Sequence, residues 1–197
     1  MRLMVSAAVR LLVMGTTGSG ALENHYSATG VKVRNKEIRN LTELLAHIKG
    51  FVPSDTQFEQ KFRTISVSKA NIARYYLRVL ECYSTGKSEP LLVPNTDVKV
   101  VNLEHVLPKS YSPHWSQFSQ GEWESYRFRL GNQAILALRL NSKMRNESFP
   151  VKLSYLRACP FTLTRGICHY PKWTPETIEE RQMQLAKLAV KTWPLST

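Results

Sequence analysis

The chain has 197 residues, 43% of them hydrophobic, and a formal net charge of +12. This length and composition suit one large or two small domains with a packed core, so the fold does not depend on covalent staples. The three cysteines have no CxxC spacing, which argues against a disulfide framework or a zinc ribbon and favours a reducing, cytoplasmic location.

Two N-terminal patterns suggest functions that we do not expect. Residues 1–14 are rich in apolar residues, as in a signal peptide, but Arg10 interrupts them, no Ala-x-Ala site follows, and the run is too short to span a bilayer. We expect a helix that packs on a neighbouring domain, and no membrane association. The glycine-rich residues 15–20 are followed by Ala21 instead of the Gly-Lys-Ser/Thr of a phosphate-binding loop, so we expect no nucleotide there.

Helical periodicity dominates the next part of the chain. Apolar residues recur at helical spacing over residues 37–50, and a short helix capped by Ser54 or Asp55 follows. Another helix is predicted from about Lys69 to Tyr83. A Gly- and Pro-containing stretch then resembles a linker, so we divide the chain into a helical region, 1–95, and a second domain, 96–197.

An acid-histidine pair follows this stretch. Residues 98–103 are rich in β-branched side chains and predict a short strand, which the residues after Pro108 end. Glu104 and His105 are therefore expected where a strand meets a loop. A histidine there can reach solvent and titrate near neutral pH, as a general base must.

A loop of about twenty residues is predicted after Pro108. It contains several aromatic residues, and a local packing role is expected for most of their rings. Stacking on unpaired bases is the alternative for one or two of them. These rings belong to Tyr111, Trp115, Phe118, Trp123 and Tyr126.

The sequence of the second half of this domain predicts a strand and two helices. Residues 129–138 form a glycine turn that enters an apolar strand with Asn132 at its start, and a basic, helix-compatible stretch begins near Asn141. The separation of nine positions between Asn132 and Asn141 suffices for a short strand and the turn into a helix. A final helix is predicted from Pro175 to about Lys191.

The residues where these predicted strands, loops and helices meet resemble those of a known family. The order strand, long loop, strand and helix, with His105, Asn132 and Asn141 where these elements meet, is similar to HNH, or His-Me finger, nucleases. The narrower motifs are Glu-His-Val-Leu-Pro at 104–108, Arg-Leu-Gly-Asn at 129–132, Leu-Asn at 140–141, and then Phe149 and Lys152. More narrowly, they resemble the C-terminal nuclease domain of GmrSD-type modification-dependent restriction enzymes. The resemblance covers residues 98 to about 194. It implies an α+β, mostly helical fold with a ββα-metal core and surrounding helices.

The resemblance also implies roles for the residues where these elements meet. His105 would be the general base, and Glu104 and Asn141 would hold one divalent ion, for which oxygen ligands favour Mg²⁺ or Mn²⁺. Asn132 would tie the loop together and hold His105 in orientation, although a simple turn residue after Gly131 fits equally well. Many HNH enzymes have Asp or His in place of Glu104, so the longer side chain either coordinates the ion or turns away from it.

Basic residues follow the pair closely. Residues 127–165 contain eight lysines and arginines and one acid, Glu147. We interpret this run as a phosphate-binding surface, although each side chain could simply face solvent. The predicted DNA-binding residues are Lys109, Lys143, Arg145 and Lys152.

The sequence therefore predicts a metal-dependent DNA endonuclease, the effector domain of a modification-dependent restriction or anti-phage defence system. The alternatives are a basic DNA-binding module with a vestigial nuclease motif and a helical adaptor of a larger restriction complex. GmrSD-type enzymes pair this domain with a ParB-like NTPase domain, and no such motif occurs here. We therefore expect such a domain in a longer protein or in a partner subunit.

Overall fold

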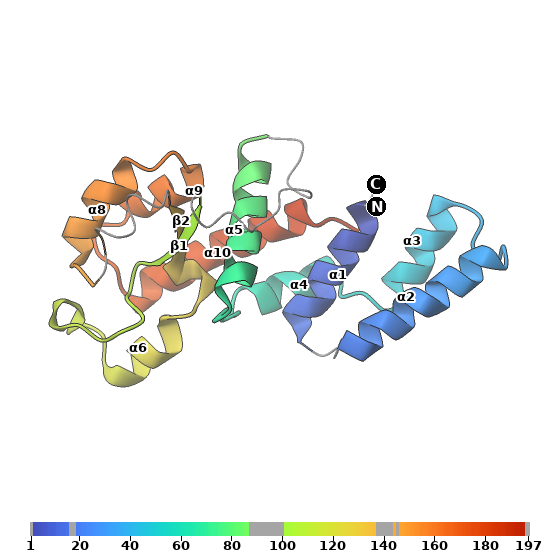
Figure 1. Cartoon of the computed structure of the whole chain (residues 1–197), viewed down its shortest axis with the longest axis horizontal. Coiled ribbons are helices and arrows are strands. Elements are labelled where there is room, and N and C mark those ends of the chain that lie inside the picture. Colours follow the sequence, from blue (N-terminus) through green and yellow to red (C-terminus); the bar gives the residue numbers. More distant parts are fainter. Residues whose placement is uncertain (1, 16–18, 87–100, 137–143, 145, 196–197) are drawn as a thin grey trace. The chain divides into compact units, whose positions relative to one another are not determined.

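The structure is a computed structural model, and it describes residues 2–15, 19–86, 101–136, 144 and 146–195 (Figure 1). The contacts divide the chain into two compact units, Met1–Phe62 with Ala189–Thr197, and Arg63–Leu188. The boundary predicted at residues 95/96 lies outside the described residues.

The first unit is helical. It contains α1 (Arg2–Met14), α2 (Ser19–Arg34), α3 (Leu41–Lys49), α4 (Asp55–Phe62) and the end of α10 (Pro175–Thr192). The predicted helix at 37–50 begins later, at Leu41, because Asn40 caps it by accepting from the backbone N–H of Glu43. Of the two candidate caps of α4, it is Ser54 whose hydroxyl accepts from the N–H of Gln57.

Arg10, which interrupts the apolar N-terminal run, is fully buried in this unit. Its guanidinium donates to the carbonyls of Trp193, at 2.9 Å, and Pro53, at 3.0 Å, and pairs with Asp55 at 2.5 Å. A buried charge is tolerated only when it is paired and hydrogen-bonded, and these three contacts meet that need. Arg10 is therefore part of the packing of α1. Among the described helices, none has both the length and the apolar character needed to cross a membrane.

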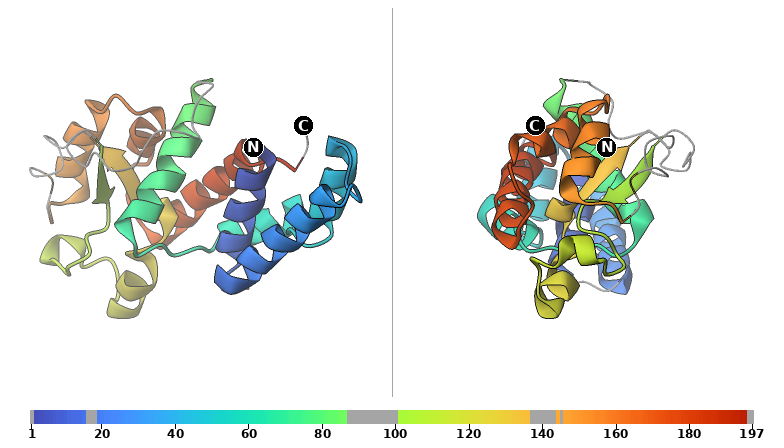
Figure 2. Two further views of the ribbon diagram at one scale, coloured as in Figure 1. Left: turned by 45° about the vertical axis from the view of Figure 1, so that its right-hand side comes forward. Right: turned by 90° about the vertical axis from the view of Figure 1, so that its left-hand side faces the viewer.

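The second unit combines helices with one small sheet, which confirms the predicted α+β, mostly helical fold. Strands β1 (Asn102–His105) and β2 (Gln133–Leu136) pair antiparallel, with His105 opposite Gln133 and Glu104 opposite Ala134. Helix α5 (Ala70–Ser84) packs beside both strands (Figure 2). The other helices are α6 (Gln120–Tyr126), α8 (Phe149–Arg157), α9 (Thr162–Arg165) and α10, with short 3₁₀ turns at Pro113–Trp115, Leu130–Asn132 and Gly166–His169.

The helix predicted after β2 lies in residues 137–143 and 145, outside the described part, so the ββα arrangement stays a prediction. The twenty-residue loop after Pro108 was predicted without structure, and this was wrong. It contains a 3₁₀ turn and α6, which begins because Ser119 and Glu122 form a reciprocal capping box.

Helix α10 fixes the entry to β2. A Cβ at Gly131 would clash with the carbonyl oxygen of Ile178, so only glycine permits this close approach. The backbone N–H of Gly131 donates to the Gln182 side chain at 2.9 Å, and buried Arg181 donates to the carbonyls of Gly131, at 2.5 Å, and Gln133, at 2.9 Å. The glycine of the Arg-Leu-Gly-Asn motif thus positions the strand that lies opposite His105.

Most of the aromatic side chains named above pack in the core of this unit. Trp115 and Phe118 are buried, and Trp123 and Tyr126 pack against the same core cluster, which confirms the packing role predicted for most of the rings after Pro108. Phe149 of α8 stacks on Trp173 with ring centroids 5.4 Å apart. Tyr111, in contrast, is 55% exposed.

Candidate functional site

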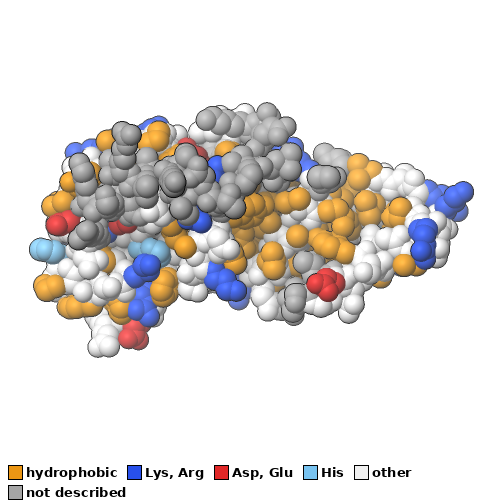
Figure 3. Space-filling view, in the orientation of Figure 1, with side chains coloured by type: hydrophobic (Ala, Val, Ile, Leu, Met, Phe, Trp, Pro, Cys, Tyr) orange, Lys and Arg blue, Asp and Glu red, His pale blue; other side chains and the backbone are white. Residues whose placement is uncertain are grey.

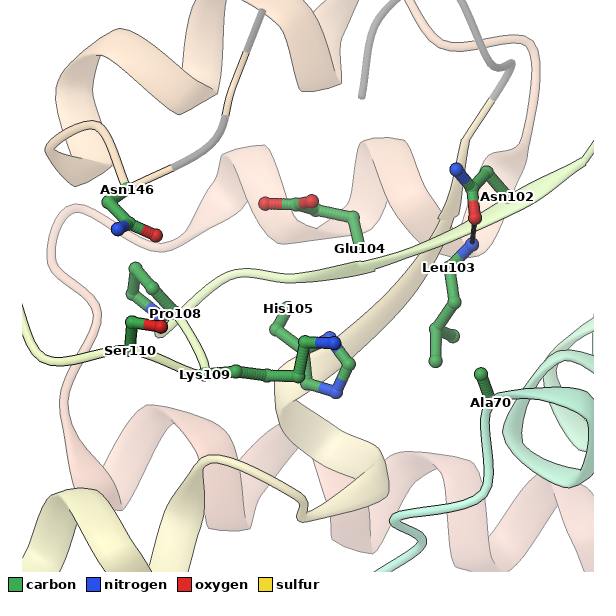
Figure 4. Close-up of a pocket in the computed structure, with 9 residues that line it drawn as sticks. All are labelled: Ala70, Asn102, Leu103, Glu104, His105, Pro108, Lys109, Ser110 and Asn146. Atoms are coloured by element: carbon green, nitrogen blue, oxygen red, sulfur yellow. Dashed lines mark hydrogen bonds between the residues drawn. The ribbon is translucent and has the colours of Figure 1, made fainter. Parts of the chain in front are cut away.

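Strand β1 carries Glu104 and His105 on opposite sides. Successive side chains of a strand alternate in direction, and Figure 4 shows the Glu104 carboxylate and the His105 ring projecting away from each other. Both residues are nearly buried, and both line a pocket of about 380 Å³. The other lining residues are Ala70, Asn102, Leu103, Pro108, Lys109, Ser110 and Asn146.

The His105 ring is held by β2 and by the segment before it. The side-chain amide nitrogen of Gln133 lies 3.1 Å from His105 Nε2 and also donates to the carbonyl of Val67 at 2.8 Å. The Phe128 ring meets the imidazole edge to face at 5.8 Å. Because an amide NH₂ only donates, Nε2 is the acceptor and Nδ1 carries the proton in this arrangement.

The protonation state of His105 follows from its burial. Loss of hydration, and then the positive charges of Lys109 and Lys152, lower the pKa of His105 to about 3. The imidazole is therefore neutral at pH 7, as a general base requires. The unprotonated nitrogen, Nε2, accepts a hydrogen bond from Gln133. His105 can therefore take a proton from a water only after this hydrogen bond is exchanged for one to that water.

Asn132 lies just before β2 and ties two chain segments together. Its Oδ1 accepts from the N–H of Leu107 at 2.7 Å and from the indole of Trp173 at 2.9 Å. Its Nδ2 donates to the carbonyls of Leu107, at 2.9 Å, and Arg127, at 3.0 Å. These bonds suit the predicted loop-holding role better than that of a simple turn residue. They act on Leu107, two residues beyond His105, and not on the imidazole.

Glu104 forms a buried ion pair with Lys152 of α8. The ammonium lies 2.5 Å from Glu104 Oε1 and donates to the carbonyl of His105 at 2.8 Å. Burial raises the pKa of Glu104, while Lys152 acts in the opposite direction. Burial likewise lowers the pKa of Lys152.

This pair corrects the prediction that Lys152 contacts DNA. Its side chain is 0% exposed, because the apolar stem is buried in the core and the ammonium is engaged by Glu104. The Lys152 ammonium is therefore not accessible to a DNA phosphate. Lys152 instead fixes the carboxylate and the end of β1.

The pocket supplies oxygen donors that suit a hard cation. Glu104 contributes a carboxylate, and Asn146 points an amide toward the same pocket (Figure 4). Asn141, the other predicted ligand, lies outside the described residues. Within the described part of the chain, no group of three His, Cys, Asp or Glu side chains could hold an ion. The described donors thus fit Mg²⁺ or Mn²⁺ in kind but form only part of a ligand set.

The sequence did not single out Asn146, which lines the pocket, or Gln133, which contacts His105. Asn146 follows Asn141 by five residues, and a second amide in a predicted metal-binding helix was the only available signal. Gln133 stands next to Asn132 in an apolar strand, where an amide side chain is unusual. Neither signal indicated which residue it would contact.

Cations lie at the mouth of the pocket and beyond it. Lys109 is exposed and lines the pocket, whereas Lys143 and Arg145 lie outside the described residues. Figure 3 shows lysine and arginine side chains gathered near a histidine on one face of this unit. Arg127 lies over the Trp123 ring, with its guanidinium carbon 4.3 Å from the centroid.

Comparison with protein families gives one finding. Residues 52–188 match the family model described as GmrSD restriction endonucleases, C-terminal domain. The match includes all of the second unit and every residue of the pocket. Comparison with curated proteins gave no match.

Proposed function

Because the chain belongs to the family of GmrSD restriction endonuclease C-terminal domains, we propose that its second unit is a metal-dependent HNH endonuclease that hydrolyses DNA phosphodiester bonds. Membership of the family makes it a nuclease effector of the restriction type. The observation that supports the finer proposal is the pocket itself, where a neutral histidine, a carboxylate and an exposed lysine lie together at the end of an antiparallel strand pair.

In this proposal His105 activates the attacking water. Its Nε2 takes one proton as the water oxygen bonds to phosphorus, and the bond from phosphorus to the leaving oxygen breaks. Gln133 releases Nε2 for this step and holds the ring before it. Asn132 keeps the chain after His105 in place through Leu107.

The metal part of the proposal concerns Glu104 and Asn141. These residues would hold Mg²⁺ or Mn²⁺, which when bound stabilises negative charge at the reacting phosphate as a Lewis acid. Lys152 opposes the rise in the pKa of Glu104 that burial causes, and its ammonium holds the carboxylate at Oε1. Lys109, at the exposed edge, is placed to contact a neighbouring phosphate.

A non-catalytic DNA-binding module or adaptor is the second candidate. It is favoured by two contacts, because Lys152 already neutralises Glu104 and Gln133 already occupies the free nitrogen of His105. An endonuclease would cut DNA and a binding module would hold it, and both roles suit a cytoplasmic protein of a restriction or anti-phage defence system. We further propose that a ParB-like NTPase domain, in the same protein or in a partner, recognises the modified DNA.

Plasmid digestion separates the two candidates. Purified wild-type protein and His105→Ala would be incubated with supercoiled plasmid in Mg²⁺, Mn²⁺ or EDTA. An endonuclease converts the plasmid only with the metal and only when His105 is present. Retained DNA binding without cleavage in any metal would favour the non-catalytic module.

A further inference from the structure

A second pocket lies next to the candidate active site. It has a volume of about 450 Å³ and is lined by Tyr111, Phe118, Ser119, Gln120 and Trp123. We call it the aromatic pocket. Its size is that of a small-molecule site, and three of its five lining residues are aromatic.

The pocket that Glu104 and His105 line, called the catalytic pocket below because of its proposed function, is connected to the aromatic pocket through a short stretch of chain. Pro108, Lys109 and Ser110 line the catalytic pocket, and the next residue, Tyr111, lines the aromatic pocket. The Trp123 indole donates to the carbonyl of Pro108 at 2.9 Å and thereby holds α6 against this stretch. A ligand that spans both pockets would pass the exposed ammonium of Lys109.

The rings of the aromatic pocket are not all part of the core. Phe118 is buried, whereas Trp123 is partly exposed and Tyr111 is 55% exposed. Arg127 lies over Trp123 and adds a positive charge beside the rings. Among the polar lining groups, the hydroxyl of Ser119 is already used in the capping box with Glu122.

We propose that the aromatic pocket binds an unpaired nucleobase of the DNA strand whose phosphates pass Lys109 and the catalytic pocket. The inference rests on the proposed function and extends it to the nucleotide beside the cleavage site. Aromatic faces next to cations are what single-stranded nucleic acid requires, because every base offers a π-face and every nucleotide a phosphate. A base paired in a duplex cannot enter such a pocket without leaving its stack.

The polar lining indicates low sequence preference. With the Ser119 hydroxyl engaged, the other polar lining groups are the Tyr111 hydroxyl and the amide of Gln120, whose nitrogen lies 3.4 Å from Glu124. Stacking accepts any base, whereas specificity needs fixed hydrogen bonds to base edges. The aromatic pocket would therefore favour single strands over duplexes rather than one sequence over another.

Tryptophan fluorescence tests this proposal directly. The chain has four tryptophans, and Trp115, Trp173 and Trp193 are at most 1% exposed, so quenching by a stacked base reports on Trp123. The full chain carrying His105→Ala, which should not cut, would be titrated with a thymidine oligonucleotide and with a hairpin duplex. Tyr111→Ala and Tyr111→Phe would be added to that background, with Tyr83→Ala, an exposed tyrosine of α5, as the matched control.

We expect the single strand to quench fluorescence at lower concentration than the duplex. Loss of one stacking ring should weaken single-strand binding roughly 5- to 100-fold in Tyr111→Ala, and Tyr111→Phe and Tyr83→Ala should bind as the parent does. Unchanged affinity in Tyr111→Ala, together with weaker binding in Lys109→Ala, would overturn the aromatic pocket alone. Absence of DNA binding by the parent protein would overturn the proposed function with it.

Discussion

The side-chain amide of Gln133 lies 3.1 Å from Nε2 of His105, directly across the strand pair. The same amide donates to the carbonyl of Val67. One side chain therefore holds the candidate base and anchors the segment before α5.

Gln133→Met should remove the hydrogen bonds that the amide donates to His105, Val67 and, at 3.5 Å, Phe128, while keeping the volume of the side chain. Because a buried carbonyl then lacks a donor, the free energy of unfolding should fall by about 1–3 kcal/mol, measured by urea denaturation. The ¹⁵N signal of His105 Nε2 should shift to that of a nitrogen without a hydrogen bond. Gln184→Met on the exposed face of α10 is the control, and an unshifted Nε2 signal would contradict the assigned contact.

His105→Ala should abolish plasmid cleavage and leave the fold intact. Removal of a general base typically lowers the rate by on the order of 10² to 10⁴. Circular dichroism would confirm folding, and His114→Ala, in the 3₁₀ turn after the site, is a matched control that should cut normally. Full activity in a folded His105→Ala protein would remove this residue from the mechanism.

Lys152→Met should destabilise the protein strongly. It leaves the Glu104 carboxylate buried without its partner, and breaking a buried ion pair in this way typically costs about 3–5 kcal/mol. Glu104→Gln with Lys152→Met should recover much of the loss, which a double-mutant cycle on denaturation energies would measure. A change of less than about 1 kcal/mol in Lys152→Met, the range of an exposed pair, would show that the pair is not buried.

Acid should destabilise the wild type through His105. Its folded pKa of about 3 lies below its unfolded value, so the unfolded chain binds more protons between these values. The stabilising contribution is complete above the unfolded pKa of about 6.5 and is lost as pH falls toward the folded pKa, by up to about 1.4 kcal/mol per pH unit.

The raised pKa of Glu104 acts in the opposite direction at low pH, so the comparison needs a variant that removes only the histidine. The difference in unfolding free energy between wild type and His105→Ala should be constant above pH 7. From pH 6.5 down to 4, the wild type should lose stability relative to the variant. A difference independent of pH would mean that His105 is not desolvated in the native state.

The basic stretch after β2 should contribute to DNA affinity through phosphates. Replacement of Lys143 and Arg145 together by Ala should flatten the dependence of log affinity on log salt by up to about 2, since each phosphate contact on duplex DNA contributes roughly 0.9. Sequence preference should not change, because phosphate contacts position the protein but do not specify bases. Fluorescence anisotropy on a short duplex measures the slope.

Lys109→Ala, at the edge of the pocket, should flatten the same slope by roughly 0.9. Lys172→Ala, an exposed lysine outside the pocket, is its control. An identical slope in the Lys143/Arg145 double variant would place the DNA elsewhere on the chain.

The sequence by itself determined the local elements and the position of the chemical groups. Strand propensity and Pro108 predicted β1, although Glu104 and His105 prove to be its last two residues instead of following it. The glycine of Arg-Leu-Gly-Asn predicted the entry to β2, and α5 and α10 begin and end within two residues of their predicted bounds. These features depend on short-range backbone preferences and side-chain periodicity, which a single sequence displays.

Only the tertiary structure decided which side chains meet. Lys152 belongs to a basic run that predicted an exposed surface, yet the packing of α8 buries it against Glu104. The strand register, and not any motif, brings Gln133 to His105. Burial and partners depend on how elements distant in sequence pack together, and local residue patterns carry little information about that packing because the same polar side chain suits a solvated face or a buried pair.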